Sequence, residues 1–177
     1  MPWFRKRVGV SSAAEQIAEA LAPRSVRRLK ETNPLGTTDS ERATTPTAEQ
    51  LQELSLLDLF AFVHGMHTVY AEDPNNRRFA FGLLAAWGSQ LVTLGVFRDR
   101  DYYIEQSQSR LAVFEAALAA RADGQPLENL TREVMAACDA PGDPSIAIGV
   151  AGFFAGSLGA SKQFFTNFSR THKLVAN

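Results

Sequence analysis

The chain has 177 residues, of which 45% are hydrophobic and 21% charged, and its formal net charge is −1. This length and composition suit one globular domain with a sizeable core, and the charge excludes a general attraction to nucleic acid. The single cysteine, Cys138, excludes an internal disulfide and favours a reducing compartment such as the cytoplasm. No histidine stands beside it in sequence, so we expect a small buried residue rather than a nucleophile.

The N-terminal segment is basic, whereas the rest of the chain is acidic. Residues 1–30 contain seven Lys and Arg residues and two acidic ones, and the remaining residues contain eleven and seventeen. Within the N-terminal segment, the aromatic rings and cations at the very start of the chain favour contact with an anionic membrane surface. A solvated terminus is the alternative. No apolar stretch of signal-peptide length follows, so no secretory signal is predicted. Two aromatic residues and three cations open the chain: Trp3, Phe4, Arg5, Lys6 and Arg7.

A short helix is predicted directly after this opening. Ser12 and Glu15 have the spacing of a capping box, which indicates a helix start. Proline breaks a helix interior, so Pro23 is expected to separate a helix near 12–22 from a second basic piece near 24–30.

A linker or extended arm is predicted next, over residues 31–47. This stretch contains six Thr, two Pro and one Gly, and it offers little apolar surface to bury. We therefore expect two parts of the chain: residues 1–47, a basic helix with an extended arm, and residues 48–177, a helical core domain.

Five further helices are predicted in the core domain. Thr47 and Gln50 have capping-box spacing, and Asp143 followed by Pro144 is typical of a helix start. No segment shows sustained alternation of apolar and polar residues, so no sheet is expected. The fold class is therefore all-α, with five to six helices. The five lie near residues 47–73, 77–97, 99–122, 126–138 and 144–170.

Two uncharged runs raise the question of membrane insertion. Residues 79–97 and 144–161 carry no charge and are long enough to span a bilayer. Gln90 lies within the first run, and Gly and Ser dilute the second. A buried pair of helices in a soluble or peripheral protein is therefore favoured, with a two-span integral protein as the alternative.

Both runs combine a narrow face of small residues with a bulky face. Such a face lets another backbone approach closely, as in close-packed membrane helices. We predict that these two helices form the centre of the fold. The small-residue faces would contact each other, another subunit or a flat apolar ligand. They comprise Gly149, Gly152, Gly156 and Gly159 in the second run and Gly82, Ala86, Ser89 and Thr93 in the first.

His64 and His67 are the candidate binding residues. They lie three positions apart, which places them on one face of the predicted helix. Two imidazoles at this spacing could bind a metal or haem, but no Glu-x-x-His pattern of the di-iron type accompanies them. Histidines that are hydrogen-bonded to neighbouring helices, or that face a wet cleft, are the favoured interpretation, and no resident cofactor is predicted.

No enzyme signature stands out in the sequence. Neither a phosphate-binding glycine loop nor a nucleophile elbow is present. The predicted function is therefore a non-catalytic structural or accessory subunit of a larger, membrane-proximal assembly in the cytoplasm. Its partners would be other protein subunits or further copies of the chain. The alternative is a helical protein that binds haem, a metal or an apolar ligand through His64 and His67.

Overall fold

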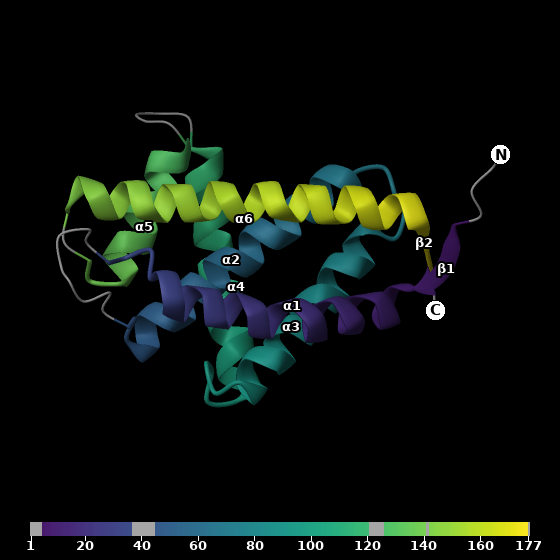
Figure 1. Ribbon diagram of the computed structural model, residues 1–177, viewed down its shortest axis with the longest axis horizontal. Coiled ribbons are helices and arrows are strands. Elements are labelled where there is room, and N and C mark those ends of the chain that lie inside the picture. Colours follow the sequence, from purple (N-terminus) through teal and green to yellow (C-terminus); the bar gives the residue numbers. More distant parts are fainter. Residues whose placement is uncertain (1–4, 37–44, 121–125, 141, 177) are drawn as a thin grey trace.

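The computed structural model describes residues 5–36, 45–120, 126–140 and 142–176, and in these ranges six α-helices dominate the structure (Figure 1). The all-α prediction with five to six helices is therefore confirmed. In chain order the elements are β1 Lys6–Gly9, α1 Val10–Thr32, α2 Ala48–Val69, α3 Asn76–Thr93, α4 Arg100–Ala119, α5 Pro126–Ala137, α6 Pro144–Thr171 and β2 His172–Val175.

Helix α2 forms the centre of the bundle. Residues 53–61 are all buried, as expected for a helix that other helices surround. α6 packs mainly along α2, and α3 packs mainly along α1, on the other side of α2 in Figure 1. The predicted central pair therefore occupies outer positions, and its two helices meet where the rings of Phe79 and Phe165 lie 5.9 Å apart.

Helix α1 corrects the predicted break at Pro23. The helix is continuous from Val10 to Thr32 with Pro23 inside it. A proline in a helix interior costs about 3 kcal/mol, but apolar residues before and after it, including Ile17 and Val26, are buried on the same core. Ser12 does not cap the helix; its hydroxyl accepts a hydrogen bond from the Gln16 side chain at 3.2 Å.

Two short strands correct the prediction that the fold has no sheet. β1 and β2 pair in parallel, from Lys6 opposite His172 to Gly9 opposite Val175. Figure 1 shows them at one end of the bundle, where α1 begins and α6 ends. Strands of four residues from opposite ends of the chain are too short to show an alternating pattern, so sequence periodicity did not predict them.

The helix starts predicted for α2 and α6 are confirmed. Thr47 and Gln50 form a full capping box, and the Asp143 carboxylate accepts a hydrogen bond from the Ser145 backbone N–H at 2.7 Å. α3 ends at Thr93, before the predicted end at residue 97, because the chain turns at Gly95, whose φ is +70°.

The N-terminal part shares one core with the rest of the chain. Apolar residues of α1 belong to the same buried cluster as those of α2 to α6, so residue 47 does not separate two cores. The start of the expected arm is also held, because Pro34 and Leu35 are buried. Residues 37–44 of that arm lie outside the described residues.

One described helix, α6, is long and apolar enough to cross a membrane. In its most apolar 18-residue window, 28% of the residues are buried. This is weak support for insertion, because a core helix of a soluble protein meets the same criterion. α3, the other span of the two-span alternative, does not meet it.

Candidate functional site

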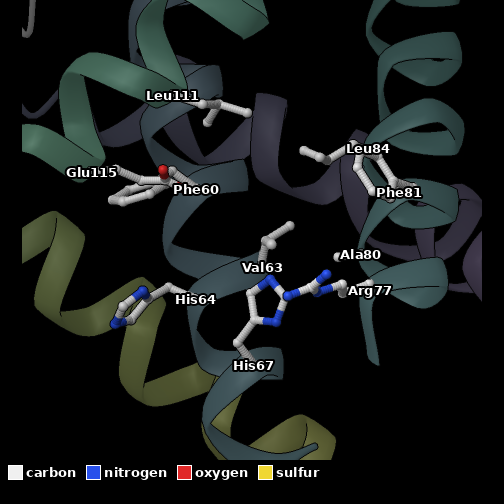
Figure 2. A pocket seen from close by; sticks show the side chains of 10 residues that line it. All are labelled: Phe60, Val63, His64, His67, Arg77, Ala80, Phe81, Leu84, Leu111 and Glu115. Carbon is white, nitrogen blue, oxygen red and sulfur yellow. The ribbon is translucent and has the colours of Figure 1, made fainter. Parts of the chain in front are cut away.

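Both predicted histidines line a pocket between α2, α3 and α4. The pocket has a volume of about 480 Å³ and is mostly apolar; we call it the histidine pocket (Figure 2). Its lining residues are Phe60, Val63, His64 and His67 of α2, Arg77, Ala80, Phe81 and Leu84 of α3, and Leu111 and Glu115 of α4.

Helical spacing explains two walls of this pocket. Phe60, Val63 and His67 follow one another at three and four residues, so α2 presents them on one face. Ala80 and Leu84 lie four residues apart, so α3 also presents them on one face. The sequence thus determines each wall, whereas the packing of α3 and α4 beside α2 brings the walls together.

Hydrogen bonding orients His67. Its Nδ1 lies 2.7 Å from Oδ1 of Asn76, at the first position of α3. An amide oxygen only accepts hydrogen bonds, so Nδ1 donates, and Nε2 is the nitrogen of the neutral ring that has a lone pair. The bond ties the end of α2 to the start of α3.

His64 lies at the exposed edge of the pocket, with its ring 6.0 Å from that of Phe60. Partial burial lowers the pKa of His64 below its ordinary 6.5, and the charges of Lys162 and His67 act in the same direction. His64 is therefore mainly neutral at pH 7.

The two imidazoles do not converge on one point. In Figure 2 the His64 ring extends to the side of α2 near α6, whereas the His67 ring extends toward Arg77. Among the residues that the structure describes, no group of three or more His, Cys, Asp or Glu side chains could hold a metal ion. The two rings therefore do not form a shared pair of ligands in this arrangement.

The small-residue face of α6 is filled at one end and open along the rest. A Cβ added at Gly149 would lie 2.5 Å from the backbone oxygen of Pro34. At Gly152, Gly156 and Gly159 an added Cβ would meet nothing within 4 Å, and all three are exposed. The predicted close contact is made at Gly149, by the turn after α1 rather than by a helix.

On α3 the corresponding face packs only in part. A Cβ added at Gly82 would lie 3.3 Å from Cβ of Ala14 in α1, and Ala86 is half-buried. Ser89 and Thr93 are exposed and bond to backbone oxygens of their own helix. α1 therefore covers the first half of this face.

A close approach between α2 and α6 involves Gly65, which was not predicted as an interface residue. A Cβ added there would lie 2.5 Å from Oγ of Ser161. The Ser161 hydroxyl donates to the backbone oxygen of Phe62 at 2.6 Å. A glycine inside a helix, opposite a small hydroxyl residue, is the signal that could have found this contact.

Part of the predicted membrane-contact segment is described. Arg5, Lys6 and Arg7 are exposed, and the last two form the start of β1. Trp3 and Phe4 lie outside the described residues. The cations are accessible to an anionic partner, on a backbone that the sheet holds in place.

Sequence analysis missed two buried carboxylates of α2, Glu53 and Asp58, which are 7% and 6% exposed. Glu53 pairs with Arg110 of α4, and Asp58 pairs with Arg28 of α1. Charged residues inside an apolar run are costly to bury alone, so their position in "LQELSLLDLF" could have predicted arginine partners.

Cys138 is buried, as the sequence predicted. Burial raises the pKa of its thiol to about 12, with a further contribution from Glu53. The thiolate, which is the reactive form, is therefore scarce at neutral pH.

In comparisons with known proteins, no family model, curated protein or solved structure matches this chain.

Proposed function

We propose that this protein binds a small apolar or weakly amphipathic molecule in the histidine pocket, without catalysing a reaction. The apolar lining of the pocket, at a volume of about 480 Å³, is the observation that supports this proposal. Pockets of this size with few polar groups are typical small-molecule sites. The rings of Phe60 and Phe81 offer flat apolar contacts.

The polar groups of the pocket suggest how the ligand is oriented. Arg77 lies at the exposed rim, and His67 presents Nε2 once Nδ1 is bonded to Asn76. An acceptor atom on the ligand would face Arg77. Its apolar body would then lie against Phe60 and Val63.

The proposal can be tested with 1-anilinonaphthalene-8-sulfonate, a fluorescent probe with an apolar ring system and one anionic group. Phe81→Ala removes an aromatic wall that is 72% exposed, so the core is left intact. We expect about fivefold weaker binding, because part of a phenyl contact is lost. The control is Ile104→Ala on α4, an exposed apolar residue (39% exposed) that does not line the histidine pocket. Equal effects of the two variants would contradict the proposal.

A second candidate function is that of an assembly subunit, and the open face of α6 favours it. Gly152, Gly156 and Gly159 leave a strip where a helix of another subunit or a second copy could approach closely. Van der Waals and Cα–H···O contacts would stabilise such a pair.

Light scattering of Gly156→Leu tests this second candidate. Space at Gly156 is open, so the substitution should dissociate the assembly without unfolding the monomer. Ala112→Leu, at an exposed position of α4, should leave the oligomeric state unchanged. A wild-type protein that is monomeric at all concentrations tested would exclude this candidate.

For location we propose the cytoplasm, with Arg5, Lys6 and Arg7 in contact with an anionic membrane surface. Exposed charge pairs are screened by salt, so high salt should release the protein from isolated membranes. Resistance to both salt and carbonate would indicate insertion instead, and recovery in the soluble fraction throughout would exclude membrane contact.

A further inference from the structure

A second cavity, separate from the histidine pocket, lies between α1 and α6. Residues from the centre of α2 and from α3 also line it. It has a volume of about 290 Å³ and shares no lining residue with the histidine pocket. We call it the arginine cavity. Its walls combine charged, hydroxyl and aromatic groups, including Arg24, Arg28, Asp58, Ser157, Phe62 and Trp87.

Both oxygens of the Asp58 carboxylate accept a hydrogen bond. Its Oδ2 accepts a hydrogen bond from Ser25, and its Oδ1 accepts one from Nη2 of Arg28 at 2.7 Å. The same Nη2 also donates to Oγ of Ser157 at 2.9 Å. These bonds fix the guanidinium between α1, α2 and α6, with its Cζ 4.7 Å from the ring centroid of Phe153.

Two buried donors, on residues that line this cavity, have no acceptor within the described part of the chain. Nε of Arg28 and Nε1 of Trp87 are buried and have no hydrogen-bond partner among the described residues. Trp87 is only 2% exposed and lines the cavity. Neither side chain can accept a hydrogen bond, and a buried donor without a partner costs about 1–3 kcal/mol. The Arg28 side chain as a whole is 42% exposed and lines the cavity together with Arg24, so its guanidinium offers donors to a ligand that brings acceptor atoms.

Charge and shape narrow the class of ligand. Arg24 and Arg28 against Asp58 leave one positive charge among the lining side chains. Phe62 and Phe164, whose rings lie 5.8 Å apart, supply apolar surface beside the donors. A volume of about 290 Å³ is at the lower limit for small-molecule pockets.

We propose that the arginine cavity binds a small organic carboxylate, with its carboxylate near Arg28 and Trp87 and its apolar body against Phe62 and Phe164. This site is independent of the proposed function of the histidine pocket. A carboxylate brings acceptors only and one negative charge, which matches the surplus of donors and of positive charge.

The experiment uses the full chain with Trp3→Phe, which leaves Trp87 as the single indole. Benzoate is titrated while the Trp87 Nε1–H resonance is followed by NMR. We expect a saturable shift with a Kd of about 1 mM or tighter. Benzamide, which has the same shape and no charge, should bind about tenfold more weakly.

A matched pair of α1 variants locates the site. Arg24 and Arg27 are both exposed, but only Arg24 lines the cavity. Arg24→Gln should weaken benzoate binding about threefold, and Arg27→Gln should leave it unchanged. Both positions are at the surface, so both variants should fold.

Several results would overturn the proposal. These are the lack of a saturable Trp87 shift, equal binding of benzoate and benzamide, and equal effects of Arg24→Gln and Arg27→Gln. Tighter binding of inorganic phosphate than of benzoate would exclude an organic carboxylate as the ligand class.

Discussion

The two ion pairs of α2 differ in how completely their neighbours enclose them. Glu53 and Arg110 have side chains that are 8% and 18% exposed, and Arg110 Nε donates to Glu53 Oε2 at 2.9 Å while Nη2 donates to Oε1. In the other pair the Asp58 side chain is 8% exposed, but the Arg28 side chain is 42% exposed. The guanidinium of the enclosed pair is thus almost fully surrounded by protein, whereas that of the open pair is partly accessible.

The surroundings explain this difference. α4 supplies Arg110, whose Cζ lies 5.1 Å from the ring centroid of Phe114, and α5 adds a backbone acceptor at Glu133. Around Asp58, α1 and α6 stand apart and leave the arginine cavity between them. Similar residue types on one helix thus serve structure near its start and, on our proposal, binding near its centre.

The largest effect is expected when the enclosed pair is broken. Arg110→Met leaves the Glu53 carboxylate buried without its partner, which should lower the free energy of unfolding by about 4 kcal/mol. Urea denaturation measures this change. The double variant Arg110→Met/Glu53→Leu should recover most of the loss, because no charge remains buried. If Arg110→Met is as stable as the wild type, this ion pair does not stabilise the fold.

Breaking the open pair should cost less. In Arg28→Met, Asp58 keeps the hydrogen bond from Ser25, and its carboxylate lines a cavity that water could enter once the guanidinium is removed. We expect a loss of about 2 kcal/mol in the same urea experiment. If Arg28→Met loses as much stability as Arg110→Met, the difference in side-chain exposure between the two pairs does not determine their contribution to stability.

Stability should also depend on pH through Glu53. Burial raises the pKa of Glu53 above its ordinary 4.5, although Arg110 opposes the shift. The folded state then holds this proton to a higher pH than the unfolded chain. The stabilisation of the folded state by protonated Glu53 is therefore fully present below pH 4.5. It is lost as the pH rises through the raised pKa of the folded state.

Glu53→Gln isolates this contribution, because it removes the titrating group and keeps a side chain of similar shape. The wild-type free energy of unfolding should fall more steeply with pH than that of the variant, by at most about 1.4 kcal/mol per pH unit. Urea titrations between pH 4 and pH 7 would measure both slopes. A wild-type slope that is equal or shallower would contradict the raised pKa.

The smallest effects concern filled and open space along α6. Gly149→Ala places a methyl group 2.5 Å from the Pro34 oxygen and should destabilise the fold by about 1 kcal/mol. Gly156→Ala meets open space and should stabilise it by up to about 1 kcal/mol, since alanine favours a helix. Thermal unfolding of the two variants compares them directly. Changes of the same sign would show that helix propensity, not the Pro34 contact, decides both.

Local signals in the sequence determined much of the helical framework. The capping box at Thr47 and the Asp143–Pro144 start were predicted, because each depends on residues within a few positions. The spacing that brings His64 and His67 to one pocket is also local, but it did not predict that the two rings extend in different directions. These features arise within one turn of helix, where sequence spacing fixes geometry.

Tertiary structure decided which faces meet. Burial on both sides of Pro23 kept α1 continuous, and the pairing of β1 with β2 joined the two ends of the chain. The glycines of α6 show the limit most clearly, because their spacing indicates a smooth face but not its occupant: Gly149 meets Pro34, and Gly156 meets nothing within 4 Å. Contacts between distant segments depend on the combined packing of all helices, and no local pattern in one helix encodes them.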